Sequence, residues 1–411
     1  MLDTRARKEE TKILLLEGIH ESAVANFKAA GFKNIETAKG ALTEDELLKT
    51  LPDVDVLGIR SRTQITHRVL ASPAAKELLV IGAFCIGTNQ IDIKTATDLG
   101  IPVFNGPYSN TRSVAEMVLG EIIMLLRGVP EKNAQLHRSI WQKGSPRSHE
   151  VRGKKLGIIG YGNIGTQLGY LAEAVGMHVY FFDIVPKLPH GNVIPVQNLK
   201  KLLQDCDIIT LHVPETAETR NMIGAQQFAM MKPGSIFINA ARGSVVDLNA
   251  LAAAMRSGHV AGAGIDVFPE EPSCDGDKFC SPLQDLDNVI LTPHIAGNTQ
   301  EAQMHIGEEV SEKLISFVQF GSTNFSVNFP QVVLYGLPGR HRVLHIHKNI
   351  PGVMSAINNV FSEQHVNIAG QYLQTNQAIG YAVTDVESEF NDIALSRLKA
   401  APGTIRVRVI S

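Results

Sequence analysis

Three polar residues have side chains that could together transfer a proton and hold an anionic substrate. Arg242 follows the apolar run SIFINAA, Glu271 follows AGAGIDVFPE, and His294 follows NVILTP. A histidine exchanges a proton near neutral pH, and a carboxylate beside it orients the ring and raises its pKa. An arginine presents a planar fork of donors to a carboxylate and a carbonyl oxygen. This set suits the movement of a hydride and a proton between a cofactor and a hydroxyl-bearing carbon.

Each of these residues also has an ordinary structural explanation when it is taken alone: a helix-capping arginine, a surface glutamate in PEEP and a Pro-His turn. The combination is more specific, because ligands bind at the carboxyl ends of parallel strands and each residue follows an apolar strand pattern. Asp266, which ends an earlier strand pattern, could contact a bound cofactor or support the histidine.

The segment KKLGIIGYGNIG, residues 154–165, has the spacing of a loop that binds a dinucleotide. Gly160, Gly162 and Gly165 follow an apolar strand pattern and precede a helical one. The first glycine permits a tight turn, the second lets the backbone approach a pyrophosphate, and the third permits close helix packing. Asp183 ends the next strand pattern, where its carboxylate would bind the ribose hydroxyls and repel a 2′-phosphate. The sequence therefore predicts NAD rather than NADP.

Alternating apolar and helical patterns predict the elements that position these residues. A first βα series runs over residues 11–104, and a second runs over residues 155–291 after a long helical pattern at residues 109–128. Such near-continuous apolar strands are typical of parallel sheets covered on both faces. Residues 340–411 follow a βαββαβ order. We therefore predict an α/β protein with two Rossmann-like, doubly wound parallel-sheet domains and a C-terminal ferredoxin-like domain.

The composition excludes several classes of function. The 411 residues include 38 basic and 41 acidic side chains, so no positive charge marks a nucleic-acid-binding protein. The N-terminal MLDTRARKEE lacks the apolar core of a secretory signal and no apolar stretch is long enough to span a membrane, which predicts a cytoplasmic protein. No metal site is predicted, because the cysteines lack metal-site spacing. The cysteines, expected to be free thiols, are Cys85, Cys206, Cys274 and Cys280.

The motifs GYGNIG with Asp183, NAARGSVVD, GIDVFPEEP and LTPHIAG resemble those of the D-isomer-specific 2-hydroxyacid dehydrogenase family over residues 11–325. The catalytic residues that this resemblance implies are Arg242, Glu271 and His294. The residues that it implies for the NAD site are Gly160, Gly162, Asn163, Ile164, Gly165, Asp183, Ala240, Ala241, Arg242, Asp266, His294 and Gly297.

Proteins of this family divide the substrate-binding domain around the NAD-binding domain. The resemblance implies a substrate-binding domain over residues 1–109 and 297–330 and an NAD-binding domain over residues 110–296. A linker at residues 331–339 would lead to the C-terminal domain at residues 340–411.

Basic residues in the first βα series predict the kind of substrate. Arg60 and Arg62 end a strand pattern in VLGIRSRT, and Lys39 ends the segment IETAK. Three such charges exceed what one carboxylate needs and suit a dianion such as a phosphate. The alternative is a set of solvated basic residues at a sheet edge. The segment FCIGTNQID could add backbone amides from Ile86 to Asn89.

The motifs GIRSRT, FCIGTNQID and NGPYSNTRSVAE are similar to those of family members whose substrate is 3-phospho-D-glycerate. The resemblance implies its oxidation to 3-phosphooxypyruvate, the first step of L-serine biosynthesis, in a homotetramer, with reduction of 2-oxoglutarate as a side activity. Another D-2-hydroxy acid, such as glycerate, lactate or 2-hydroxyglutarate, is one alternative, and an NAD-sensing, non-enzymatic corepressor of the same fold is another. Trp141 would anchor a subunit interface or be an ordinary buried aromatic. The implied substrate-site residues are Lys39, Arg60, Ser61, Arg62, Asn110, Gln303 and, from a neighbouring subunit, Lys143.

The C-terminal unit resembles an ACT domain, a fold that binds amino-acid effectors, commonly at an interface between two copies. Its segment HIHKNIPG matches the effector loop, and the resemblance implies L-serine as an inhibitor whose effect the linker at 336–339 transmits. Lys348, Ile350 and the linker YGLPGRHR, which lacks an adjacent glycine pair, depart from the family's pattern. A dimerisation module that binds no ligand is the alternative. The implied effector residues are His347, Asn349 and Asn367.

Overall fold

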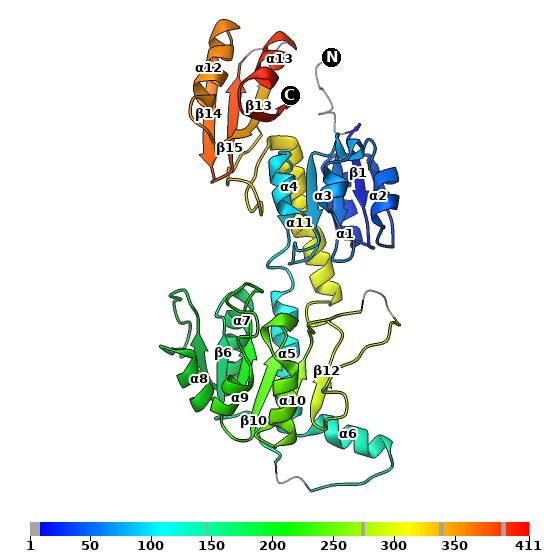
Figure 1. Ribbon diagram of the computed structural model, residues 1–411, viewed down its shortest axis with the longest axis vertical. Coiled ribbons are helices and arrows are strands. Elements are labelled where there is room, and N and C mark those ends of the chain that lie inside the picture. The colour runs from blue at the N-terminus through cyan, green and yellow to red at the C-terminus, as the bar shows by residue number, and fades with distance from the viewer. Residues whose placement is uncertain (1–8, 145–146, 273–275, 337–340, 388–391, 411) are drawn as a thin grey trace. The chain divides into compact units, whose positions relative to one another are not determined.

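The contacts between residues divide the chain into two units. Unit 1 comprises Met1–Ser109 and Gln303–Ser411, and unit 2 is Asn110–Ala302 (Figure 1). The chain therefore leaves unit 1 after Ser109 and returns to it at Gln303. The bounds of the predicted substrate-binding, NAD-binding and C-terminal domains stay predictions. The computed structural model describes residues 9–144, 147–272, 276–336, 341–387 and 392–410.

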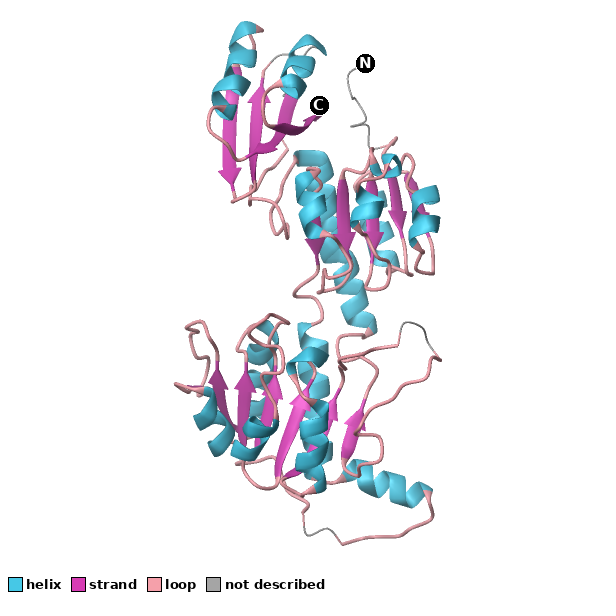
Figure 2. Ribbon diagram, in the orientation of Figure 1, coloured by secondary structure: helices cyan, strands magenta, loops and turns pink. Residues whose placement is uncertain are grey.

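Unit 1 contains a five-stranded parallel sheet in the order β2-β1-β3-β4-β5. Every residue of β3 and β4 is buried, because helices cover both faces of the sheet (Figure 2). On one face, α11 packs Val310 and Leu314 into the same apolar cluster as Ile13 and Phe84. The strands are β1 (Lys12–Leu15), β2 (Asn34–Thr37), β3 (Val56–Ile59), β4 (Val80–Ala83) and β5 (Val103–Asn105). The helices are α1 (Glu21–Ala29), α2 (Glu44–Thr50), α3 (His67–Leu70), the 3-10 helix η1 (Pro73–Ala75), α4 (Ile93–Asp98) and α11 (Gln300–Phe320), which begins in the last residues of unit 2.

The C-terminal part of unit 1 has the βαββαβ order that the sequence predicts. Its strands form an antiparallel sheet in the order β14-β15-β13-β16. Val353 and Ile357 of α12 and Leu395 and Leu398 of α13 lie in one apolar cluster with Val343 of the sheet. The elements are β13 (His341–Lys348), α12 (Val353–Glu363), β14 (Ile368–Thr375), β15 (Ile379–Val386), α13 (Asp392–Ala400) and β16 (Thr404–Ile410).

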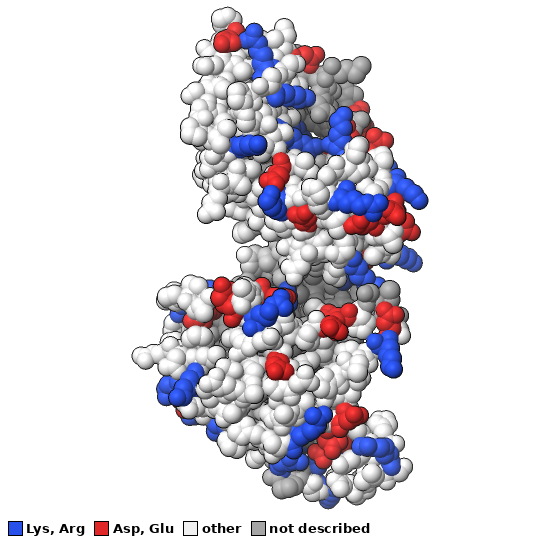
Figure 3. All heavy atoms as spheres, viewed as in Figure 1, with Lys and Arg blue, Asp and Glu red and all other residues white. Residues whose placement is uncertain are grey.

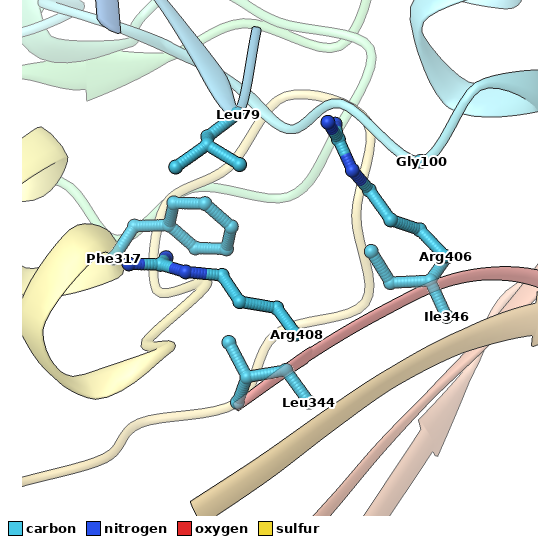
Figure 4. Close-up of a pocket in the computed structure, with 7 residues that line it drawn as sticks. All are labelled: Leu79, Gly100, Phe317, Leu344, Ile346, Arg406 and Arg408. Atoms are coloured by element: carbon cyan, nitrogen blue, oxygen red, sulfur yellow. The ribbon is translucent and has the colours of Figure 1, made fainter. Parts of the chain in front are cut away.

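Hydrogen bonds join β16 of this antiparallel sheet to the loop before β4 and to α11. Arg406 of β16 donates to the carbonyl oxygen of Leu78 at 2.6 Å, and Arg408 donates to that of Val318 at 2.7 Å. Figure 4 shows both arginines reaching from β16 into the pocket that they line with apolar side chains. The predicted linker also packs on the sheet, because Val332 and Leu334 share an apolar cluster with strand residues. The predicted linker residues 337–339 and the first ACT residue, 340, lie outside the described residues.

Unit 2 contains a seven-stranded parallel sheet in the order β12-β11-β10-β9-β6-β7-β8. The strand order reverses between β6 and β9, and dinucleotides bind at the carboxyl ends of strands at such a point. The strands are β6 (Lys155–Ile159), β7 (His178–Phe182), β8 (Ile194–Pro195), β9 (Ile208–Leu211), β10 (Ser235–Asn239), β11 (Val260–Ile265) and β12 (Val289–Leu291). The helices are α5 (Thr111–Leu126), α6 (Val129–His137), α7 (Asn163–Ala174), α8 (Leu199–Asp205), α9 (Ala225–Met230), the 3-10 helix η2 (Gly243–Val245) and α10 (Leu248–Arg256).

The surface agrees with the balanced charge of the sequence. On the face drawn in Figure 3, Lys and Arg side chains are interspersed with Asp and Glu, without a continuous basic field. In the described part of the chain, no helix is both long and apolar enough to cross a membrane. Cys85, Cys206 and Cys280 form no disulfide with any described residue, and Cys274 lies outside the described residues.

Candidate active site

The sheet of unit 2 brings the three predicted catalytic residues to the carboxyl ends of adjacent strands. Arg242 follows β10, Glu271 follows β11, and His294 follows β12, and these three strands pair in that order. The His294 Nδ1 lies 2.9 Å from Oε2 of Glu271. The His294 backbone has a φ of 55°, in the left-handed region that non-glycine residues rarely adopt. Its N–H donates to the carbonyl oxygen of Asp266 at 2.8 Å, which holds this conformation.

Asp266 supports the loop that carries His294. Its Oδ1 accepts hydrogen bonds from the Thr292 hydroxyl at 2.6 Å and the Ile295 N–H at 2.8 Å. Its Oδ2 accepts one from the Ala296 N–H at 2.9 Å, and the residue is only 1% exposed. Of the two predicted roles for Asp266, this geometry supports the positioning of the histidine, and its direct contact with a cofactor stays a prediction.

Glu271 and His294 shift each other's pKa in opposite directions. The Glu271 carboxylate raises the pKa of His294, mainly through the hydrogen bond, and this effect outweighs the burial of the ring. Burial by itself would raise the pKa of Glu271. The pKa is nevertheless lowered, by the hydrogen bond to His294 and the charge of its ring, by the hydrogen bond from the Phe268 N–H, and by the charge of Arg242. Glu271 is therefore an ionised acceptor, so Nδ1 of His294 carries the donated proton and Nε2 is free to take one.

A glycine that the sequence reasoning missed positions Arg242. A Cβ on Gly243 would lie 1.9 Å from the backbone carbon of Phe268, so only glycine lets the loop after β10 approach the loop before Glu271 this closely. The Arg242 carbonyl oxygen accepts a hydrogen bond from Asn239 at 3.0 Å. The glycine directly after the arginine in NAARGSVVD was the available signal, but Phe268, which it contacts, lies in the loop after another strand, β11.

The glycine-rich loop has space where a pyrophosphate would bind. A Cβ on Gly160 or Gly165 would lie 2.4 Å or 2.3 Å from a backbone oxygen, whereas one on Gly162 would meet no atom of the described residues within 4 Å. No side chain in the described part of the chain caps the N-terminus of α7, which begins with the predicted residues Asn163 and Ile164, so its amides suit a phosphate. The Asp183 carboxylate accepts a hydrogen bond from the Tyr161 N–H at 2.8 Å and thus lies beside this loop. These residues fit a dinucleotide.

The remaining predicted NAD-site residues lie at two places in unit 2. Ala240 and Ala241 precede Arg242, and the Ala241 N–H donates to the Asn239 side chain at 3.1 Å. Gly297 follows the His294 loop, and a Cβ there would lie 2.3 Å from Nδ2 of Asn110, a predicted substrate residue. The beginning and the end of unit 2 therefore meet at these two residues.

The predicted phosphate-binding residues of unit 1 follow the carboxyl ends of strands in one sheet. Lys39 follows β2, and Arg60, Ser61 and Arg62 follow β3. The 86–89 loop follows β4, the neighbour of β3. Gln303 lies near the start of α11, and Lys143 and Trp141 lie in unit 2, where the Trp141 side chain is 78% exposed. The interpretation of Trp141 as a buried aromatic is therefore wrong for a single chain.

The predicted effector residues are not all together within one chain. His347 is 3% exposed at the end of β13 that pairs with Gly380, and Asn349 follows this end. Asn367 precedes Ile368, which is at the other end of the sheet, on the order of 25 Å away at ~3.3 Å per strand residue. Asn349 donates to the Asn376 carbonyl oxygen at 2.8 Å. A site containing all three effector residues therefore needs more than one copy of this sheet.

Comparisons with known proteins agree with this architecture. Residues 119–296 match the family described as D-isomer specific 2-hydroxyacid dehydrogenase, NAD binding domain, and residues 343–406 match the AHAS small subunit-like ACT domain. The chain is 55% identical over 412 residues to the D-3-phosphoglycerate dehydrogenase of Escherichia coli strain K12, with 100% of both chains covered.

It is 53% identical over 403 residues, 98% of each chain, to the D-3-phosphoglycerate dehydrogenase of Haemophilus influenzae. Among solved structures, the D-lactate dehydrogenase from Aquifex aeolicus complexed with NAD and lactic acid is similar, with a TM-score of 0.67 and 27% identity. That match covers 78% of this chain and 100% of the other. The matches confirm the predicted fold class, the NAD-binding domain and the ACT domain.

Proposed function

The chain belongs to the D-isomer specific 2-hydroxyacid dehydrogenase family, and from this premise we propose that it oxidises 3-phospho-D-glycerate to 3-phosphooxypyruvate with NAD, the first step of L-serine biosynthesis. The observation that carries the proposal is the His294–Glu271 pair at the carboxyl edge of a dinucleotide-binding sheet. The names of the relatives that match over the whole chain support the choice of substrate. The enzyme would act in the cytoplasm and would reduce 2-oxoglutarate as a side reaction.

Each residue has a defined role in this reaction. Bound NAD would accept the hydride that leaves the substrate carbon. The free Nε2 of His294 takes the proton of the substrate hydroxyl, while Glu271 holds the ring and stabilises its protonated form. Arg242 binds the carboxylate and the carbonyl oxygen that forms. Lys39, Arg60, Ser61 and Arg62 bind the phosphate, with Asn110, Gln303 and a neighbouring subunit's Lys143 completing the substrate site.

The test is NADH formation by the purified full chain with 3-phosphoglycerate, glycerate, lactate and 2-hydroxyglutarate. Phosphoglycerate should have the highest kcat/KM, and His294→Ala should lower turnover on the order of 10²- to 10⁴-fold while NAD binding persists. Arg60→Ala should raise KM for phosphoglycerate and leave KM for lactate unchanged. Faster oxidation of an unphosphorylated acid would reassign the substrate, and no oxidation of any hydroxy acid would favour the corepressor of the same fold.

We further propose that L-serine is the effector and that two ACT domains from different chains complete its site in a homotetramer. The opposite placement of Asn349 and Asn367 in one chain supports this arrangement, and the exposed Trp141 suits a subunit contact. Serine should inhibit steady-state oxidation, and light scattering should give the mass of four chains. Unchanged rates at millimolar serine would reject serine as an inhibitor.

A further inference from the structure

Glu17 has a buried carboxylate that binds the main chain of the predicted phosphate-binding loop. It lies two residues after β1 and is 8% exposed. Its Oε1 accepts hydrogen bonds from the N–H groups of Arg60 at 3.1 Å and Thr63 at 2.9 Å, and its Oε2 accepts one from Arg62 at 3.0 Å. One side chain from the turn after β1 therefore holds the loop that follows the neighbouring strand β3.

The main chain at Glu17 also holds the loop that carries Lys39. The Glu17 N–H donates to the carbonyl oxygen of Gly40 at 3.1 Å, and the Gly18 N–H donates to that of Ala38 at 2.9 Å. These two carbonyls flank Lys39 on either side. Glu17 is thus the residue through which the loops carrying all three predicted basic residues are connected.

The conformation of Glu17 is unfavourable for its residue type. Its φ is 61°, in the left-handed region, which is unfavourable for a non-glycine residue because its Cβ crowds the backbone. A glycine would adopt this turn more easily but would have no carboxylate to offer. A strained residue whose side chain and main chain both organise one site is typical of a functional constraint.

Because Glu17 occupies the N–H groups of Arg60, Arg62 and Thr63, those amides are not available to an anion. The substrate must instead be held by side chains, whose direction depends on the conformation of this backbone. Gln90, which is 8% exposed, holds the other side of the loop by donating to the carbonyl oxygens of Arg60 at 2.7 Å and Gly87 at 3.3 Å.

We propose that Glu17 is a positioning residue that sets the geometry in which Lys39, Arg60 and Arg62 bind the phosphate of the substrate. The inference rests on the proposed function, since it assigns the phosphate group to this loop. It goes beyond that function by placing phosphate affinity under the control of a buried carboxylate that does not touch the substrate.

The matched pair of variants is Glu17→Gln and Asp55→Asn in the full chain. Asp55 is also a buried carboxylate, 3% exposed, and its Oδ2 accepts a hydrogen bond from the Lys12 N–H at 2.8 Å at the opposite, amino end of the same strands. Glu17→Gln replaces one acceptor oxygen by an amide donor. It should raise KM for 3-phosphoglycerate on the order of 10-fold or more, because misplaced binding groups weaken the affinity for the phosphate. It should leave kcat and KM for NAD within about twofold, because the His294–Glu271 pair is unchanged. Asp55→Asn should leave all three constants unchanged.

A second readout does not depend on turnover. Inorganic phosphate, added with saturating NAD, should raise the Tm of the wild type and of Asp55→Asn and raise that of Glu17→Gln much less. If the wild type does not oxidise phosphoglycerate, the proposed function fails. An unchanged KM in Glu17→Gln, together with the same phosphate-induced rise in Tm as the wild type, overturns the role of Glu17. If Glu17→Gln does not fold, Glu17→Asp replaces it, because the aspartate side chain is too short to reach all three amides. The KM for phosphoglycerate and the phosphate-induced rise in Tm then decide the proposal in the same way.

Discussion

Glu121, in the middle of α5, should make the protein less stable as the pH rises. It is 1% exposed, and neither carboxyl oxygen has a hydrogen-bond partner among the described residues. The carboxyl group lies against Gly264 of β11, where a Cβ would be 2.7 Å from Oε2. Burial, and secondarily the negative charge of Asp266, raise the pKa of Glu121 from 4.5 to about 8. Glu121 is therefore a neutral acid in the folded protein at neutral pH.

This shift gives a definite dependence of stability on pH. Because the folded-state pKa is raised, the contribution of Glu121 to stability is complete below about pH 4.5 and is lost as the pH rises towards about 8. Each unit of pH in this window costs about 1.4 kcal/mol, so the loss between about pH 5 and about pH 7.5 is on the order of 3 kcal/mol. Glu121→Gln cannot ionise and should not show this loss.

Urea unfolding of the wild type and of Glu121→Gln at several pH values measures the effect. The difference in free energy of unfolding should grow in favour of the variant by about 3 kcal/mol from about pH 5 to about pH 7.5. Any constant cost of burying the amide cancels in this comparison. Glu116→Gln is the matched control, because Glu116 lies in the same helix in an exposed ion pair with Arg112. A difference that is the same at every pH would refute the assignment of Glu121 as a neutral acid.

Two further outcomes follow from the site. Glu271→Gln removes the charge that raises the pKa of His294, so it should lower kcat at least on the order of 10²-fold and move the acidic limb of the pH profile for oxidation to lower pH. An unmoved limb in kcat/KM against pH would contradict the role of the pair. Gly243→Ala forces the backbone away from Phe268 and should cost about 1–3 kcal/mol and reduce kcat. A Cβ on Gly120 in α5 would meet none of the described residues within 4 Å, so Gly120→Ala should instead stabilise the protein by about 0.5–1 kcal/mol in thermal unfolding.

Local sequence patterns predicted the elements and the class of chemistry. The apolar run, the glycines and the following helical pattern determined a strand, a tight turn and α7, because each depends on neighbours within a few residues. The residue types at strand ends predicted an acid–base pair and an arginine, and the structure brings Glu271 and His294 into contact. Their chemical roles stay predictions until activity is measured.

The sequence left open the questions that depend on more than one element. The two roles of Asp266 could not be distinguished, because its partners lie in the 292–296 loop. The resemblance assigns His347, Asn349 and Asn367 to an effector site, yet the antiparallel register places Asn367 at the other end of the sheet from His347. The segment interpreted as a linker packs Val332 and Leu334 on the C-terminal sheet as far as it is described.

By itself, the sequence determined the βα periodicity, the dinucleotide loop and the family, since these are carried by residues adjacent in the chain. Only the tertiary structure decided which polar groups meet: Glu17 binds Arg60, 43 residues away, and Asp266 binds Ile295, 29 residues away. These contacts exist because β1 pairs with β3 and β11 pairs with β12. The order in which strands pair is set by packing of the whole sheet, and no local apolar pattern encodes it.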